Sequence, residues 1–131
     1  MPPQRREGAA MRAVLHVCTT CRGIDPAAGP DAPRPGAILH GVLSDAAPEC
    51  VQVRPVECLS ACSQGCAVAL SAPGCWSYVY GRLTPADAAE IIQGARAYAA
   101  SGDGIVPWRE RPAIFRKQSL ARIPPHTLSQ E

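Results

Sequence analysis

Cysteine spacing is the feature of this sequence with the clearest chemical meaning. Three of the seven cysteines, Cys58, Cys62 and Cys66, follow one another at intervals of four residues. Cysteines at this spacing in a loop or single turn can direct their sulfurs to one point, as a soft metal or an iron–sulfur cluster requires. The small residues between them allow backbone amides to approach charged sulfurs. This stretch is therefore predicted to be a metal-binding or cluster-binding site.

A second group of cysteines, Cys18 and Cys21, lies well upstream, with two residues between its members. Cys18 follows a short apolar run over residues 12–17, and Cys58 follows residues 50–56, in which apolar and polar residues alternate. Both stretches are expected to be strands. The carboxyl ends of neighbouring parallel strands meet at one edge of a sheet, so this order would bring the two cysteine groups together.

The segments around these strands carry turn and helix signals. Prolines and glycines interrupt residues 23–36, so no regular element is expected to survive there. A short helix is expected over residues 37–43, and its start can lie within this loop. Pro73–Gly74 is a turn signal between two apolar stretches, residues 67–70 and 76–80. These two stretches are predicted to form an antiparallel hairpin.

A second helix is predicted to start at Thr84, with Thr84 as N-cap, Pro85 at the first helical position and Asp87 in the first turn. Ser101–Gly104 should end it. The chain thus contains a βαβ unit followed by a ββα unit. This order predicts an α/β protein with a thioredoxin-like fold: a four-stranded mixed sheet flanked by helices, followed by an extended C-terminal tail.

The chain of 131 residues is expected to form one domain large enough to bury a core without disulfides. Residues 11–104 are predicted to be the thioredoxin-like domain. Residues 1–10 are polar and rich in proline and arginine, and we expect a disordered tail there, with translation starting at Met1 or at Met11. Residues 105–131 are predicted to be a basic extended tail packed on the domain.

Composition restricts the class of protein. The odd number of cysteines and the absence of an apolar signal-peptide run favour a reducing, cytoplasmic compartment over a secreted disulfide framework. No apolar stretch has the roughly 18 residues expected of a membrane span. A net charge of +2 gives no reason to expect nucleic-acid binding. The partners expected are therefore neither nucleic acid nor membrane, and a homodimer is compatible with the sequence.

Three stretches, Val17–Cys21, Glu57–Cys62 and Ala121–Pro125, resemble a family of small bacterial proteins described as predicted metal-binding proteins of unknown function. More distantly, the cysteine groups resemble those of thioredoxin-like [2Fe-2S] ferredoxins, including the small cluster-bearing subunit of respiratory complex I. That resemblance implies a [2Fe-2S] cluster held by Cys18, Cys21, Cys58 and Cys62. Cys66, four residues beyond Cys62, is an alternative ligand by its spacing. The complex I subunits usually have four residues between the first two cysteines, whereas this chain has two.

The main functional expectation is a metal-binding protein, in particular a ferredoxin-like electron carrier. Four thiolates also suit zinc, so a structural-zinc or metal-delivery protein is an alternative. A thiol–disulfide oxidoreductase that uses Cys18 and Cys21 is another, although Gly23 and Pro26 interrupt the helix that would lower the thiol pKa. We find no paired carboxylates, Ser-His-Asp set or phosphate-binding glycine loop, so the sequence favours electron transfer or metal binding over enzymatic bond chemistry.

The C-terminal region suggests how a redox partner could bind. It carries a local excess of positive charge, contributed by Arg109, Arg111, Arg116, Lys117 and Arg122. These residues could bind an acidic redox partner protein. Alternatively, they face water while Trp108, Ile114 and Phe115 hold the tail on the domain.

The remaining cysteines, histidines and aromatic residues are expected to be structural. Cys50 and Cys75 fit small buried residues at strand starts. The histidines lack partner ligands at metal spacing; they are His16, His40 and His126. The alternate positions of Trp76, Tyr78 and Tyr80 indicate packing on one face of a strand.

Overall fold

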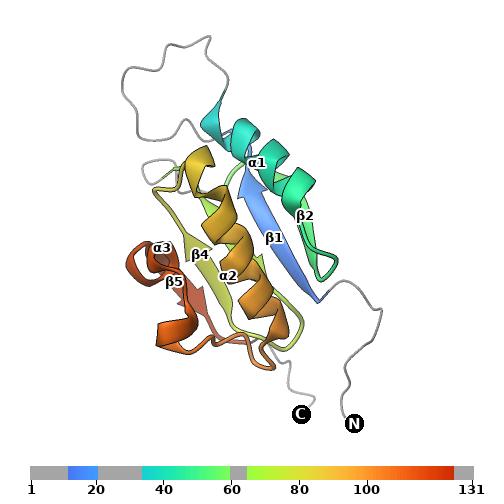
Figure 1. Cartoon of the computed structure of the whole chain (residues 1–131), viewed down its shortest axis with the longest axis vertical. Helices are drawn as coiled ribbons and strands as arrows, with labels where there is room; N and C mark the ends of the chain where they lie inside the picture. The colour runs from blue at the N-terminus through green and yellow to red at the C-terminus, as the bar shows by residue number, and fades with distance from the viewer. Residues whose placement is uncertain (1–11, 21–33, 60–64, 126–131) are drawn as a thin grey trace, which may run out of the picture.

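Figure 1 shows the computed structural model, which describes residues 12–20, 34–59 and 65–125. A five-stranded mixed sheet has the order β2-β1-β3-β4-β5. Its strands are β1 (Ala13–Cys18), β2 (Val51–Val56), β3 (Val68–Ser71), β4 (Ser77–Tyr80) and β5 (Ser119–Ile123). The helices are α1 (Pro35–Ala46), α2 (Ala88–Ala100) and α3 (Ala113–Lys117), with 3-10 turns η2 (Pro85–Asp87) and η3 (Trp108–Glu110).

Strand pairing follows the predicted order. β1 pairs in parallel with β2, with Ala13 opposite Val51 and Cys18 opposite Val56. β1 also pairs antiparallel with β3, which pairs antiparallel with β4. Gly74, at φ 72°, occupies the left-handed region in the turn between β3 and β4, where glycine has no steric penalty. The βαβ unit, the hairpin and the thioredoxin-like arrangement predicted from the sequence are therefore confirmed.

Two details differ from the prediction. The sheet has five strands rather than four because Ser119–Ile123 pairs antiparallel with β4. All residues of β5 are exposed, so this strand shows no alternation of buried and exposed positions. In addition, α1 spans Pro35–Ala46 and is longer at both ends than the helix predicted over residues 37–43, with its start inside the preceding loop, as the sequence allowed. Proline suits the first turn of a helix because the backbone N–H that it lacks would have no partner inside the helix.

The start of α2 agrees with the sequence signals. η2 and α2 follow Thr84 directly, and the Thr84 backbone N–H donates to Asp87 Oδ2 at 2.9 Å. Such a side-chain acceptor satisfies a donor that the first helical turn leaves without a partner. No described helix is long and apolar enough to cross a membrane.

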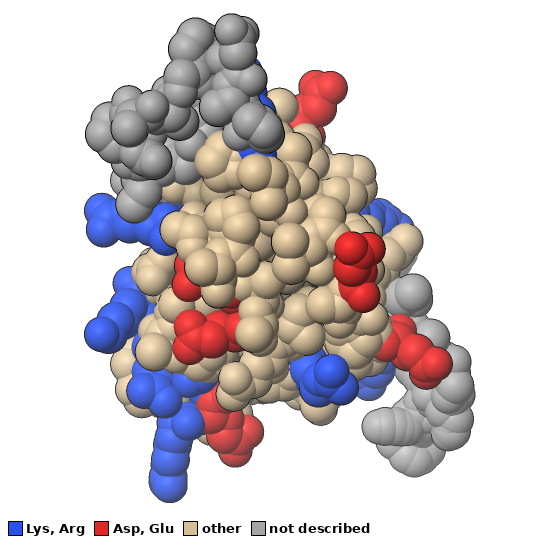
Figure 2. Space-filling model, turned by 45° about the horizontal axis from the view of Figure 1, so that its top comes forward, with Lys and Arg blue, Asp and Glu red and all other residues tan. Residues whose placement is uncertain are grey.

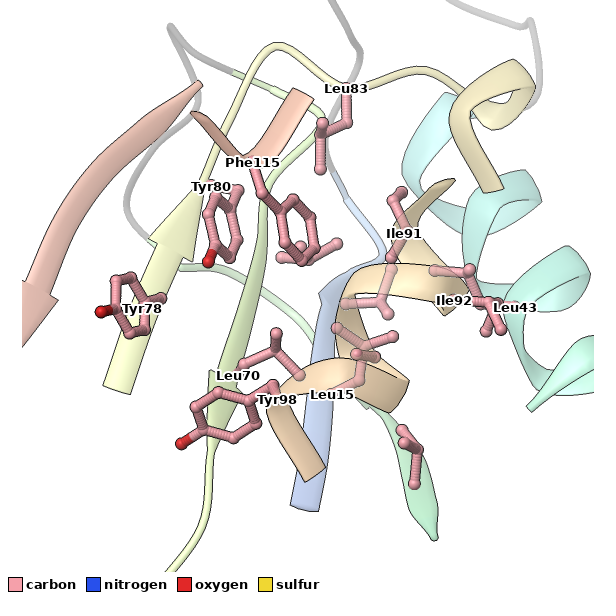
Figure 3. Packing of buried hydrophobic residues seen from close by; sticks show 14 of the residues in the cluster. Leu15, Leu43, Leu70, Tyr78, Tyr80, Leu83, Ile91, Ile92, Tyr98 and Phe115 are labelled. Atoms are coloured by element: carbon pink, nitrogen blue, oxygen red, sulfur yellow. The ribbon is translucent and has the colours of Figure 1, made fainter. Parts of the chain in front are cut away.

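The core lies between the sheet and the two long helices. α1 and α2 lie beside each other over one face of the sheet (Figure 1). Leu15 of β1, Leu43 of α1, Leu70 of β3 and Ile91 of α2 are fully buried, and Figure 3 shows them meeting in this layer. Burying one such side chain contributes about 1.5–3 kcal/mol, so these contacts fix the helices on the sheet.

The C-terminal region is attached to the domain by aromatic packing. The Phe115 ring stacks on Tyr80 with centroids 3.9 Å apart (Figure 3). An added Cβ at Gly94 would lie 2.2 Å from Phe115 Cε2, so α2 makes room for this ring by having no side chain there. Ile114 packs against the core, whereas Trp108 is 61% exposed. Of the three residues predicted to hold the C-terminal region on the domain, Phe115 and Ile114 therefore do so and Trp108 does not.

Candidate metal centre

The parallel pairing of β1 and β2 sets the geometry of the candidate site. Cys18 is the last residue of β1 and lies opposite Val56, and Cys58 follows two residues beyond Val56. The Cys18 thiol donates to the Glu57 carbonyl at 3.6 Å, and the Thr19 N–H donates to the Val56 carbonyl at 2.9 Å. The structure therefore brings Cys18 against the segment that carries Cys58. Cys18 is buried and Cys58 is exposed.

Cys21 and Cys62, the other two predicted ligands, lie outside the described residues. Within the described part of the chain, no three His, Cys, Asp or Glu side chains are grouped so that they could hold a metal ion. Of the four predicted ligands, the structure thus describes Cys18 and Cys58.

Cys66, the alternative ligand, lies at the same edge of the sheet. Its N–H and C=O exchange hydrogen bonds with Leu83, both at 3.1 Å, and the neighbouring Ala67 carbonyl accepts from the Cys18 N–H at 3.1 Å. Burial raises the pKa of the Cys66 thiol to about 11, with further contributions from Cys18 and Asp87. Cys66 is therefore a protonated thiol at neutral pH, close enough to Cys18 for the two to interact electrostatically.

Two threonines tie the cysteine segments together, a role that the sequence analysis missed. The Thr19 hydroxyl donates to the Val56 carbonyl at 3.3 Å, and the Thr20 hydroxyl donates to the Glu57 carbonyl. Thr20 Oγ1 also lies 3.8 Å from the Cys18 sulfur. These bonds fix the backbone after β1 against the backbone after β2. Threonine between the two upstream cysteines was the available signal, because a hydroxyl directly after a strand end can reach the neighbouring strand.

Positive electrostatic groups also lie at this edge, and the sequence analysis missed them too. Arg34 Nη1 donates to the Thr20 carbonyl at 2.8 Å. α1 connects two parallel strands, so it runs against them and its N-terminus lies at their carboxyl edge (Figure 1). A helix N-terminus and a guanidinium both favour negative charge nearby. This environment suits thiolates.

The residues expected to be structural lie away from this edge or have ordinary partners. Cys50 precedes β2 at the opposite end of the strand, and the buried Cys75 thiol donates to the Gly102 carbonyl at 3.6 Å. His16 Nε2 lies 3.1 Å from Ser71 Oγ. Burial, together with Arg54, lowers the pKa of His16. His40 lies 3.4 Å from Ser44 Oγ on α1, and His126 lies outside the described residues.

Solved structures show which class of fold this is. The chain resembles a thioredoxin-like [2Fe-2S] ferredoxin from Aquifex aeolicus with a TM-score of 0.55 at 18% identity, covering 91% of this chain and 100% of that one. A wild-type structure of that description gives a TM-score of 0.51 at 18% identity, with coverages of 86% and 99%. A cysteine-to-serine variant gives 0.51 at 17%, with coverages of 83% and 98%. The fold is thus that of thioredoxin-like ferredoxins.

The family follows from the sequence. Residues 15–125 match the model of the family described as "Protein of unknown function (DUF1636)", and the chain belongs to this family. No curated protein matches the chain.

Proposed function

We propose that this protein is a ferredoxin-like electron carrier with a [2Fe-2S] cluster held by Cys18, Cys21, Cys58 and Cys62. The observation that carries the proposal is the parallel β1–β2 pair, which brings Cys18 against the segment of Cys58. Solved proteins with this fold are described as [2Fe-2S] ferredoxins, which supports the choice of cofactor. Four cysteine thiolates are the usual ligands of such a cluster.

The residues around Cys18 fit an anionic group with several thiolates. Thr19 and Thr20 hold the two ligand segments together through the Val56 and Glu57 carbonyls. Arg34 adds a positive charge beside the first of these segments. When bound, the cluster would supply one-electron transfer, while these residues would position the thiolates and favour their negative charge.

The burial of Cys18 argues against the thiol–disulfide oxidoreductase alternative. Disulfide exchange needs a thiolate that a substrate disulfide can approach. Cys18 is 1% exposed, and its thiol donates to the Glu57 carbonyl rather than pointing into solvent. A buried ligand is compatible with electron transfer, because electrons do not require contact between the partner and the sulfur.

We further propose an acidic redox partner that binds through the C-terminal basic residues. In Figure 2 several Lys and Arg side chains lie along the left side of the molecule, with Asp and Glu side chains between them, and other Lys and Arg side chains lie elsewhere. Arg111 is turned inward, where its Nε donates to the Val106 carbonyl at 2.7 Å. Arg109 and Lys117 are exposed and available to a partner. Arg116 is also exposed, but its guanidinium donates to the Trp108 carbonyl at 3.1 Å and to the Arg109 carbonyl at 3.4 Å. Charge of this kind steers association of transient complexes more than it strengthens them.

Metal and sulfide analysis of the full chain purified without oxygen tests the cofactor. We expect a coloured protein with about two irons and two sulfides per chain. Reduction with dithionite should bleach the visible bands and produce a paramagnetic signal. A protein with one zinc and no sulfide would overturn the proposal in favour of a structural-zinc site.

A further inference from the structure

The loop from Gly81 to Leu83 follows β4 and lies at the edge of the sheet that carries the candidate metal centre. Leu83 exchanges two backbone hydrogen bonds with Cys66, both at 3.1 Å. Ala67, which follows Cys66, accepts from the Cys18 N–H at 3.1 Å. The loop is therefore connected to the predicted ligand Cys18 through backbone hydrogen bonds of the residues directly before β3.

Arg82, in the middle of this loop, has an unusual backbone conformation. Among the residues that the structure describes, it is the one non-glycine residue with a positive φ, at 56°. A residue with a side chain is strained in this region, because its Cβ lies too close to a carbonyl oxygen of the backbone. Such a conformation persists only where the surrounding structure holds it. The contacts of the loop should therefore include a group that holds Arg82 in place.

Gln118 supplies that group. Its side-chain Nε2 donates to the Gly81 carbonyl at 2.8 Å and to the Arg82 carbonyl at 2.7 Å. Its backbone carbonyl accepts from the Gly81 N–H at 3.0 Å. A side-chain amide has two N–H donors, so it can serve both carbonyls of the loop at once. Gln118 directly precedes β5, so the C-terminal region holds this loop in its strained conformation.

The Gln118 amide acts on the loop and is not needed to attach β5. β5 is attached without it, because the strand pairs with β4 and because Phe115 stacks on Tyr80. The edge of the sheet that carries the cysteines is thus held from two sides. On one side the Thr19 N–H donates to the Val56 carbonyl at 2.9 Å, and on the other side Gln118 holds the loop that pairs with Cys66.

We propose that Gln118 is a positioning residue of the metal centre. Its side-chain amide holds Gly81 and Arg82, so Leu83 keeps Cys66 and Ala67 in place. Ala67 in turn keeps the backbone of Cys18 in place. Residues of this kind orient metal ligands without contacting the metal. The role rests on the proposed function, because Cys18 is a ligand only if the protein holds the cluster.

Gln118→Met tests this role in the full chain purified without oxygen, because methionine is similar in length and lacks both N–H donors. We expect the variant to bind the cluster but to lose it to excess EDTA about tenfold faster than the parent protein. The paramagnetic signal of its reduced form should also be broader, since Cys18 is held less uniformly. Gln52→Met is the matched control. Gln52 lies opposite Val14, away from the cysteine edge, and this variant should match the parent protein in both measurements.

Arg82→Gly separates the positioning role from a general loosening of the fold. Glycine adopts a positive φ without strain, so adding Arg82→Gly to Gln118→Met should restore slow cluster loss and the narrow signal. Two results would overturn the role of Gln118 while the proposed function stands. One is a Gln118→Met variant with the release rate and signal of the parent protein. The other is a double variant that holds its cluster no better than Gln118→Met alone. A parent protein without iron and sulfide would overturn the proposed function and the role of Gln118 with it.

Discussion

Three cysteines at one edge of the sheet differ in their surroundings. Cys18 and Cys66 are buried, whereas Cys58 is exposed. The N–H and the C=O of Cys66 both form hydrogen bonds with the backbone of Leu83. Burial, Cys18 and Asp87 raise the pKa of the Cys66 thiol to about 11. A place at this edge of the sheet therefore does not by itself make a cysteine a ligand. Single substitutions can show which of the three cysteines bind the cluster.

Substitution of Cys18 tests the ligand set. Cys18→Ser should abolish the visible absorption of protein purified without oxygen and lower the melting temperature, because a bound cluster stabilises only the folded chain. Cys75→Ser is a matched control because Cys75 is also buried, 6% exposed compared with 1% for Cys18. The control should lose some stability but keep its colour. Equal loss of absorption in both variants would mean that the effect is general unfolding.

A second pair of substitutions distinguishes Cys62 from Cys66. We expect Cys62→Ser to lose the cluster and Cys66→Ala to keep it, because the proposed ligand set contains Cys62 and not Cys66. Iron content per chain is the measurement. If Cys66→Ala loses iron while Cys62→Ser retains it, the fourth ligand is Cys66.

The contact between α2 and α3 depends on a missing side chain. Gly94→Ala would place a Cβ 2.2 Å from the Phe115 ring, which is itself stacked on Tyr80. Overpacking of this kind costs about 1–3 kcal/mol. The free energy of unfolding, measured with denaturant, should therefore fall although alanine favours the helix.

Gly41→Ala in α1 is the control for this substitution. Nothing lies within 4 Å of the added Cβ at Gly41. Alanine in a helix interior is favoured over glycine by up to about 1 kcal/mol, so this variant should be as stable as the parent protein or more stable. A stabilising Gly94→Ala would show that the Phe115 ring can move without cost.

The elements that the sequence predicted are those whose signals are local. β1 and the hairpin are apolar runs bounded by turns, and Thr84 begins a helix with its own cap. β5 could not be predicted, because its exposed residues form a strand only by pairing with β4. At the candidate site, cysteine spacing indicated Cys18. The hydrogen bond from Arg34 to the Thr20 carbonyl forms only because the fold places the start of α1 beside the end of β1, and no local sequence pattern specifies that placement.

At the scale of the whole molecule, the basic side should control the rate of electron transfer. Replacing Arg109 and Lys117 together by glutamine should slow transfer to an acidic flavodoxin at low salt. The difference should fade as the screening length shortens to about 8 Å at physiological ionic strength. Stopped-flow rates measured over a series of salt concentrations provide the test.

Arg54→Gln is the control for this charge effect. Arg54 is exposed on β2, at the other end of the strand order from β5. It should change neither the rate nor its salt dependence. Because Arg54→Gln removes one charge and the double variant removes two, an effect of Arg54→Gln about half as large would mean that net charge, rather than the C-terminal basic side, governs the association.

The two outer strands of the sheet limit how copies of this protein can associate. The Val56 carbonyl of β2 accepts a hydrogen bond from the Thr19 N–H and therefore faces β1. Neighbouring residues of a strand direct their backbone groups to opposite sides, so the Pro55 nitrogen faces the open edge of the sheet. A further strand would need an N–H donor at this position, and proline has none. β5 contains Arg122 and is followed by Pro124 and Pro125. Proline and charge at an outer strand disfavour the addition of another strand. Within the described part of the chain, both outer strands therefore disfavour growth into a continuous intermolecular sheet, the first step of fibril formation.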